Sequence, residues 1–337
     1  MCEVHLKQLA VLGAGSWGTA LAIALAERFS EIKLWARDPA CATSMRQKRE
    51  NARYLPGSRL PENIAVSSNI GWVVSEAKVV LIAIPSAHLR GVINSARPHL
   101  IKSASLVSAT KGLEEDSLCR MSEVMIGVLG PGSEANIAVL SGPTFAKEIA
   151  AGEPAAVVVS SQDIDLAEQI QQIFSTAALR LYTSSDVAGV EIGAALKNVI
   201  AIGAGVCRGL GLGSNSVAAL VTRGLAEITR LAGVLGGHPR TLSGLAGLGD
   251  LVLTATGDLS RNRFVGVQLG QGQSLEKILA GMTMVAEGVG TCRAAYRLGL
   301  KHGVGLPIVN KMYEILYQAK DPRQAIRELM ERPLTSE

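Results

Sequence analysis

The hydrophobic positions of this chain change their spacing about halfway along it. Up to residue 185, short apolar runs alternate with stretches in which apolar residues recur at helical intervals. Short apolar runs are typical of β-strands, and strands that alternate with helices favour a mostly parallel sheet with right-handed connections. The predicted strands cover residues 9–12, 32–36, 64–66, 79–84, 105–110, 136–141, 155–160 and 179–183.

Beyond residue 185 the strand signal stops and the apolar patterns are helical. Residues 184–186 (Ser-Ser-Asp) form a cluster of helix-capping residues, and Asp321 followed by Pro322 is a second clear helix start. We therefore place a domain boundary near residue 185, between domains of residues 1–185 and 186–337, without a flexible linker. The predicted helices cover residues 186–210, 214–235, 242 onward, 274–282, 290–302, 307–317 and 322–330.

The first of these helices carries a lysine, Lys197, in a nearly uncharged apolar sequence. A helix that is apolar on most sides is normally buried, and an ammonium group is rarely buried without a partner. Glu191 lies six positions away on another helical face, so it is not an obvious partner. Burial lowers a lysine pKa and suits it to proton transfer near neutrality. The alternative is that the aliphatic stem of Lys197 crosses apolar surface while its ammonium group reaches water.

A glycine motif directly follows the first predicted strand. Gly13, Gly15 and Gly18 form a GxGxxG motif, and a helix rich in Ala and Leu is predicted over residues 19–29. In this context Gly13 permits the tight turn, Gly15 admits the pyrophosphate of a dinucleotide, and Gly18 lets helix and strand pack closely. We expect a Rossmann-type doubly wound, mostly parallel sheet followed by an all-helical C-terminal domain. A glycine turn used only for packing is the alternative.

The second predicted strand ends in Arg37 and Asp38. In this fold an acidic residue about 20 positions beyond the glycines binds the ribose 2′-hydroxyl of NAD, whereas an arginine accommodates the 2′-phosphate of NADP. The position of Arg37 favours NADP without excluding NAD. Alternatively, Arg37 is a solvated charge at a strand end.

Three polar residues follow the ends of later strands, where ligands bind in parallel sheets. Ser86 follows the fourth strand; it would line the nicotinamide side, and it also suits the N-cap of the next helix. Lys111 and Thr144 follow the fifth and sixth strands. A lysine in such a place is otherwise an ordinary loop charge in water.

Two places in the helical half have unusual polarity. Asp250 is a single carboxylate within a glycine-rich apolar run, where it is either functional or a plain N-cap. Ser260 is a predicted N-cap, and Arg261, Asn262 and Arg263 occupy the first turn after it. Arginine is unfavourable at a helix N-terminus unless an anion binds there, so this helix start predicts a phosphate site.

Composition narrows the class of protein. The net charge of +4 is spread along 337 residues without a basic block, which argues against nucleic-acid binding and suits a small anionic substrate. The five cysteines have no metal-ligand spacing and are expected to be reduced thiols in a cytoplasmic protein, so no metal site is predicted. No uninterrupted apolar segment approaches the length that spans a membrane, so we expect no stable membrane insertion.

Together these motifs resemble the bacterial type of NAD(P)-dependent glycerol-3-phosphate dehydrogenase, in family order and spacing over essentially the whole chain. The matching segments are residues 13–18, 109–112, 141–146, 196–198, 247–251, 260–263 and 285–288. Two departures touch no group assigned to chemistry: Ala286 stands where the family often has valine, and the segment before Ser260 is variable.

The resemblance implies a role for each matching residue. It makes Lys197 the proton donor and acceptor, with Lys111 and Asp250 beside it. The substrate-binding positions are Lys111, Gly142, Thr144, Lys197, Asp250, Ser260, Arg261 and Asn262. The cofactor-binding positions are Gly13, Gly15, Ser16, Trp17, Gly18, Arg37, Tyr54, Lys111, Ala146, Arg261, Val285 and Glu287.

The resemblance also implies the reaction, a hydride transfer between NAD(P)H and the C2 carbonyl of dihydroxyacetone phosphate that gives sn-glycerol 3-phosphate for glycerophospholipid synthesis. We expect a homodimer whose substrate is a phosphorylated triose. The alternative enzyme is a 3-hydroxy-acid or sugar-acid dehydrogenase of related two-domain architecture, which would need a carboxylate receptor in place of Ser260, Arg261 and Asn262. A catalytically silent NADP-sensing regulator would need neither Lys197 nor Asp250.

Overall fold

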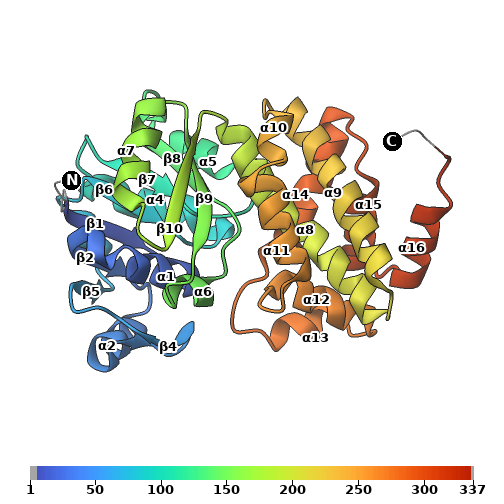
Figure 1. Cartoon of the computed structure of the whole chain (residues 1–337), viewed down its shortest axis with the longest axis horizontal. Coiled ribbons are helices and arrows are strands. Elements are labelled where there is room, and N and C mark those ends of the chain that lie inside the picture. Colours follow the sequence, from blue (N-terminus) through green and yellow to red (C-terminus); the bar gives the residue numbers. More distant parts are fainter. Residues whose placement is uncertain (1–5, 335–337) are drawn as a thin grey trace.

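The structure, a computed structural model, describes residues 6–334 and contains an eight-stranded sheet with the order β10-β9-β8-β7-β6-β1-β2-β5 (Figure 1). All eight predicted strands are present. Neighbouring strands are parallel except β8 and β9, which confirms a mostly parallel sheet. The strands are β1 (Leu6–Leu12), β2 (Phe29–Trp35), β5 (Ile64–Ser67), β6 (Val79–Ile82), β7 (Ser105–Ser108), β8 (Ile137–Ser141), β9 (Ala155–Ser161) and β10 (Leu179–Ser184). A separate hairpin pairs β3 (Glu50–Asn51) with β4 (Leu55–Arg59).

Helices cover both faces of this sheet, which explains why a central strand such as β6 is a continuous apolar run. Successive residues of β1 alternate between two cores: Leu9 and Val11 pack on one side, Ala10 and Leu12 on the other. The first face is covered by α1 (Ser16–Ala24), α2 (Pro39–Lys48), α6 (Ala146–Ala150) and α7 (Ile164–Phe174). The second face is covered by α3 (Ile70–Val74), α4 (Leu89–Ala96) and α5 (Met121–Leu129).

The predicted end of the helix after the glycine motif was wrong. Helix α1 ends at Ala24, a 3₁₀ turn covers Ala26–Arg28, and Phe29 already belongs to β2. Phe29 is buried and meets Phe174 edge-to-face, with 6.2 Å between the ring centroids. This contact with α7 favours the strand over the helix propensity of the preceding residues.

The order of the strands reverses between β1 and β6, which are neighbours although β2 follows β1 in the chain. Ligands of open parallel sheets bind in the crevice at such a switch point. The glycine turn after β1 and the segment after β6 lie at this crevice.

The helical part is built around α8 (Val187–Gly209), whose residues from 189 to 207 are all buried. This helix is long and apolar enough to cross a membrane, but its apolar stretch is entirely enclosed by protein, so it is a core helix. Around it pack α9 (Ser214–Val234), α11 (Asp250–Thr256), α12 (Arg261–Gly270), α14 (Glu287–His302) and α15 (Pro307–Tyr317) (Figure 1). The remaining helices are α10 (Pro239–Leu242), α13 (Leu275–Ala280) and α16 (Pro322–Met330).

Helices α8 and α12 approach each other very closely. A Cβ added at Gly266 of α12 would lie 1.9 Å from the carbonyl oxygen of Ile202 in α8, and one at Gly205 would lie 2.1 Å from the carbonyl oxygen of Arg263. Only glycine fits at both positions. This contact holds α12 against the C-terminal half of α8.

The helix caps predicted at Asp186 and Asp321 are present, but two helices differ from the prediction. Asp186 caps α8 by accepting from the backbone N–H of Gly189 at 2.8 Å, and Asp321 caps α16. The helix predicted from residue 242 is instead α10, a π-helical turn at Leu245–Gly249 and then α11. Helix α14 begins at Glu287, three residues before the predicted start, which brings Glu287 into its first turn.

Candidate active site

The glycine turn has the geometry of a dinucleotide site. Gly13 has φ +117°, and a Cβ there would lie 2.4 Å from the carbonyl oxygen of Ala83 in the neighbouring chain segment. A Cβ at Gly18 would lie 1.9 Å from the carbonyl oxygen of Gly13. Gly15 has no neighbour within 4 Å of its Cβ position, and α1 begins at Ser16 without a side-chain cap. The open side of Gly15 and the uncapped N–H groups therefore fit a pyrophosphate.

Asn51, which the sequence analysis missed, supports the glycine turn through hydrogen bonds of its side chain. Its side-chain amide is buried and donates to the carbonyl oxygen of Ala14 at 2.9 Å and to Thr19 Oγ1 at 2.8 Å. Its oxygen accepts from the backbone N–H of Tyr54 at 3.2 Å. The β3–β4 hairpin is thereby fastened to the glycine turn, and Tyr54 stands next to it.

Arg37 leaves the end of β2 as an exposed side chain. Within residues 6–334 its guanidinium forms no hydrogen bond or ion pair. The neighbouring Asp38 accepts from the backbone N–H of Ala40 at 2.9 Å and caps α2. The Asp38 carboxylate is therefore a helix cap, whereas the Arg37 guanidinium remains available to bind an anion.

Lys197 lies at the centre of a buried charge cluster. Its ammonium donates to Asp250 Oδ1 and, at 2.8 Å, to Thr254 Oγ1. Asp250 is fully buried, and its Oδ2 accepts from Lys111 Nζ at 2.8 Å. One carboxylate therefore lies between two ammonium groups. The alternatives of a lysine reaching water and of a plain N-cap at Asp250 are both wrong, because Lys197 is 4% exposed and α11 has no side-chain cap.

Burial lowers the pKa of Lys197 to about 7. The charge of Asp250 opposes this shift, whereas the positive charge of Lys111 adds to it. Both the charged and the neutral form of Lys197 are therefore populated near neutrality. The apolar surroundings of the lysine in the sequence predict the direction of this shift.

Thr254 is the second residue that the sequence analysis missed. It lies four positions after Asp250, on the same face of α11, and its hydroxyl donates to the Asp250 carbonyl oxygen at 2.7 Å. The hydroxyl oxygen then faces Lys197 as an acceptor. The i, i+4 spacing from a buried carboxylate is a signal that was available in the sequence.

Lys111 reaches the cluster from the end of β7 and is not a loop charge in water. Besides contacting Asp250, its ammonium donates to the carbonyl oxygen of Gly142 at 3.3 Å. The Thr144 hydroxyl donates to the same carbonyl at 3.1 Å. A Cβ at Gly142 would lie 2.8 Å from Val157 Cα, so a side chain there would displace β9. The ends of β7 and β8 thus face the Lys197 helix.

The start of α12 is linked to the residue that follows Lys197, because Asn262 contacts Asn198. Ser260 caps the helix by accepting from the Arg263 N–H at 3.2 Å, as predicted. Arg261 Nη1 donates to the carbonyl oxygen of Val285 at 3.0 Å, and burial lowers the pKa of Arg261. The neighbouring Arg263 pairs with Asp258, with 2.7 Å between Nη1 and Oδ1.

The Asn262 amide joins three helices. Its nitrogen donates to Asn198 Oδ1 at 2.9 Å, in the residue after Lys197, and its oxygen accepts from the Gly288 N–H at 3.0 Å. Both ends of the buried amide are therefore engaged within the protein. Asn262 therefore fixes the start of α12 relative to α8 and α14.

Ser86 does not cap the helix that follows it, so that prediction was wrong. It begins a 3₁₀ turn, Ser86–His88, and α4 starts only at Leu89. Its hydroxyl instead donates to Glu287 Oε2 at 2.7 Å. Burial raises the pKa of Glu287, while the Ser86 hydrogen bonds and the Arg261 charge oppose this rise. The nearby positions Ala146 and Val285 are the first residue of α6 and an exposed side chain before α14.

Glu191 does not pair with Lys197, as the sequence predicts. Its buried carboxylate accepts from Arg120 Nη1 and from the Ser122 N–H, each at 2.8 Å. It therefore fastens α8 to the beginning of α5 and leaves the lysine cluster undisturbed.

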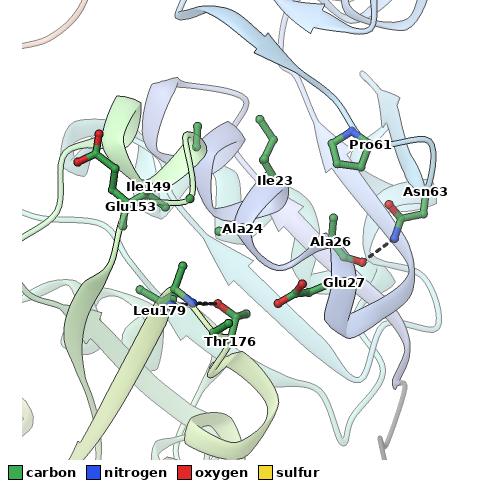
Figure 2. Close-up of a pocket in the computed structure, with 14 residues that line it drawn as sticks. Ile23, Ala24, Ala26, Glu27, Pro61, Asn63, Ile149, Glu153, Thr176 and Leu179 are labelled. Carbon is green, nitrogen blue, oxygen red and sulfur yellow. Dashed lines mark hydrogen bonds between the residues drawn. The ribbon is translucent and has the colours of Figure 1, made fainter.

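A cavity of about 520 Å³ lies elsewhere, between the ends of α1 and α6 and the beginning of β10 (Figure 2). Its walls include Ile23, Glu27 and Ile149; Asn63 at its edge donates to the Ala26 carbonyl oxygen at 2.8 Å. No residue of the lysine cluster lines it, so it is not the candidate active site.

Among residues 6–334 there is no group of three His, Cys, Asp or Glu residues placed to hold a metal ion. Cys41, Cys119, Cys207 and Cys292 are free thiols; Cys2 lies outside the described residues.

Comparison with known proteins gives consistent matches. The family model of the NAD-dependent glycerol-3-phosphate dehydrogenase N-terminus matches residues 8–167, and the model of the C-terminus matches residues 186–327. The glycerol-3-phosphate dehydrogenase [NAD(P)+] of Koribacter versatilis (strain Ellin345) is 52% identical over 334 residues, 98% of this chain and 99% of that protein. Its counterpart from Geobacter sp. (strain M21) is 49% identical over 331 residues, again 98% and 99% of the two chains. The crystal structure of glycerol-3-phosphate dehydrogenase from Coxiella burnetii superimposes with a TM-score of 0.92 at 36% identity, covering 97% of this chain and 99% of that one.

Proposed function

We propose roles for the site residues from one premise: this chain belongs to the NAD-dependent glycerol-3-phosphate dehydrogenase family. Its reaction is the transfer of hydride between NAD(P)H and the C2 carbonyl of dihydroxyacetone phosphate, which gives sn-glycerol 3-phosphate. The bound nicotinamide supplies the hydride. The protein supplies orientation, charge and a proton.

Lys197 is the proton donor in the reduction and the proton acceptor in the reverse direction. As C2 gains the hydride, negative charge grows on the carbonyl oxygen, and a nearby ammonium stabilises that charge before donating its proton. The pKa of about 7 suits both directions near neutrality. Asp250 and Thr254 hold the ammonium in place.

Lys111 assists as a second positive charge. Two ammonium groups share the single carboxylate of Asp250, so the cluster carries a net positive charge when Lys197 is protonated, which complements an oxyanion. This arrangement is the observation that carries the proposal. A fold that used Lys197 only for packing would have no need of a second lysine on the same buried carboxylate.

The substrate phosphate docks on Arg261 and the first turn of α12. That helix start offers N–H groups and the positive end of the helix dipole, and Arg261 adds a guanidinium. Ser260 and Asn262 fix the beginning of α12. Gly142 and Thr144 form the side of the site next to the sheet. Binding of the remote phosphate fixes the carbonyl next to Lys197.

The cofactor lies along the switch point, with its pyrophosphate at the glycine turn. Arg37 favours NADP over NAD, because its free guanidinium suits a 2′-phosphate. The other cofactor contacts come from positions spread over both parts of the chain: Gly13, Gly15, Ser16, Trp17, Gly18, Tyr54, Lys111, Ala146, Arg261, Val285 and Glu287.

Further parts of the proposal concern the whole protein. Residues 1–185 and 186–337 form two domains, since β10 ends at Ser184 and α8 begins at Val187. The protein works in the cytoplasm as a homodimer and feeds glycerophospholipid synthesis. Size-exclusion chromatography with light scattering tests the dimer; a monomeric mass at assay concentration would refute it.

A turnover assay that follows cofactor absorbance tests the function. Reduction of dihydroxyacetone phosphate is expected with both cofactors, at higher kcat/KM with NADPH, and no oxidation of 3-hydroxy acids. The 3-hydroxy-acid alternative is not favoured, because the matches named above are full-length glycerol-3-phosphate dehydrogenases. Turnover of 3-hydroxy acids without turnover of the triose phosphate would reverse this conclusion.

A further inference from the structure

A short turn before α14, residues 285–288, is tied to the phosphate-site helix at two points. Arg261 Nη1 donates to the carbonyl oxygen of Val285 at 3.0 Å, and the Gly288 N–H donates to Asn262 Oδ1 at 3.0 Å. We call this segment the 285–288 turn. Its position depends on α12, and through Asn262 it depends on α8.

The cofactor-binding sheet reaches the same turn through Ser86. Ser86 follows β6 at the switch point, is 8% exposed, and its hydroxyl donates to Glu287 Oε2 at 2.7 Å. The two residues are 201 positions apart in the chain. This hydrogen bond thus connects the sheet directly to the first turn of α14.

The backbone after Lys111 packs against this hydrogen bond. Gly112 has φ +136°, and a Cβ there would lie 2.8 Å from Ser86 Oγ and 3.4 Å from Glu287 Oε2. The absence of a side chain at Gly112 leaves just enough room for the Ser86–Glu287 pair. A side chain at the residue next to Lys111 would therefore displace that pair.

The Glu287 carboxylate depends strongly on its few partners. Burial raises its pKa, and the interactions that oppose this are the Ser86 hydrogen bonds and the charge of Arg261. A buried carboxylate that loses a hydrogen-bond donor carries the full cost of its desolvation. Removal of the Ser86 hydroxyl would take away the largest of these opposing interactions and leave Glu287 with the backbone hydrogen bond of Ser86 and the charge of Arg261.

We propose that Ser86 is a positioning residue that holds the Glu287 carboxylate at the cofactor site and thereby joins the sheet to the 285–288 turn. The inference rests on the proposed function in one respect, since it assumes that Glu287 contacts the bound cofactor. Ser86 acts through Glu287. It needs no contact of its own with the substrate or the nicotinamide.

Cofactor titration of single and double variants tests this role. NADPH binding is measured in the absence of substrate through the fluorescence of the dihydronicotinamide. Ser86→Ala should raise the Kd of NADPH by about tenfold or more, as expected for a lost hydrogen bond to a charged group. Ser86→Cys, which keeps a weak donor, should show a smaller rise. The matched control is Ser95→Ala: Ser95 is exposed on α4, bonds only to its own helix at Gly91, and should leave Kd unchanged.

The double variant decides whether Ser86 acts through Glu287. Glu287→Gln alone should weaken NADPH binding, and adding Ser86→Ala to it should change Kd by less than about threefold, because the partner is already altered. Full additivity of the two changes, or a Ser86→Ala variant that binds NADPH like Ser95→Ala, would overturn the proposal. The readout is independent of the proposed reaction. A protein that fails to reduce dihydroxyacetone phosphate but shows this coupling would refute the function and leave the role of Ser86 standing.

Discussion

Replacing Asp250 by Asn is expected to shift the pH dependence of turnover, because the Asp250 carboxylate keeps Lys197 protonated. The carboxylate contacts Lys197 through one oxygen and Lys111 through the other. In the variant the two ammonium groups keep their size but lose their shared anion. Each then disfavours the charged form of the other.

The magnitude follows from the pKa of Lys197, which is about 7 with the carboxylate present. An opposite charge in direct contact shifts a pKa by about 1–3 units, so its loss lowers the pKa of Lys197 by about 2 units. At neutral pH about half of the Lys197 side chains are charged in the parent protein and about 1% in the variant. Loss of the proton donor then lowers kcat for reduction about 50-fold at pH near 7, but only about twofold at pH near 5.

The assay is kcat for dihydroxyacetone phosphate reduction at saturating NADPH, measured from about pH 5 to about pH 9. The sign is fixed: the protonated lysine is the active form, so the activity of the variant must fall at lower pH than that of the parent. Asp165→Asn, an exposed carboxylate in the first turn of α7, is the matched control and should reproduce the parent profile. A loss of equal size at every pH would refute the reasoning, since Asp250 would then act on something other than protonation of Lys197.

Three further predictions concern the phosphate, the cofactor and stability. Arg261→Lys keeps the charge but loses the planar fork, so KM for dihydroxyacetone phosphate should rise more than about tenfold, while the slow reduction of dihydroxyacetone should hardly change; an equal loss for both substrates would contradict the phosphate role. Arg37→Asp should weaken NADPH far more than NADH in cofactor titrations, because only NADPH carries the 2′-phosphate; equal weakening would place Arg37 away from the adenosine ribose. Glu227 accepts from the first N–H groups of α15, and burial raises its pKa to about 7. Because this pKa is raised, the contribution of Glu227 to stability is present below pH 4.5 and is lost as pH rises through about 7. Glu227→Gln should therefore remove up to about 3 kcal/mol of the change in the free energy of unfolding between those pH values, measured by urea unfolding. Identical pH dependence of that free energy in both proteins would contradict this prediction.

Much of the fold was predictable because its signals are local. A strand covered on both faces is apolar at every position, as in residues 79–84, and a glycine motif between a strand and a helix fixes the first turn of the sheet. The unusual position of Lys197 was predictable for the same reason, since a single charge in a long apolar helix contrasts with its neighbours, and the structure shows that this lysine is buried. The error at Phe29 arose where a tertiary contact with Phe174 outweighed local helix propensity.

The parts of the site that could not be predicted depend on contacts between distant segments. Asn51 belongs to a hairpin without hydrophobic alternation, so nothing in its surroundings indicates that its amide supports the glycine turn. Ser86 is a serine before a helix and therefore resembles an N-cap. Only the position of Glu287 shows that its hydroxyl links the sheet to α14. Thr254 was predictable in part. Its spacing from Asp250 is visible in the sequence, but only the structure shows that its hydroxyl accepts from Lys197.

The central claim is that Lys197 delivers the proton, and turnover of Lys197→Ala tests it most directly. Loss of a proton donor costs about 10²–10⁴-fold, and loss of charge stabilisation adds to it, so kcat should fall at least about a thousandfold. The Kd of NADPH should stay within about threefold of the parent value, because the lysine acts on the substrate carbonyl and lies among Asp250 and Thr254, away from the glycine turn. A variant that keeps more than about a tenth of the parent kcat would show that Lys197 is structural and would contradict the account.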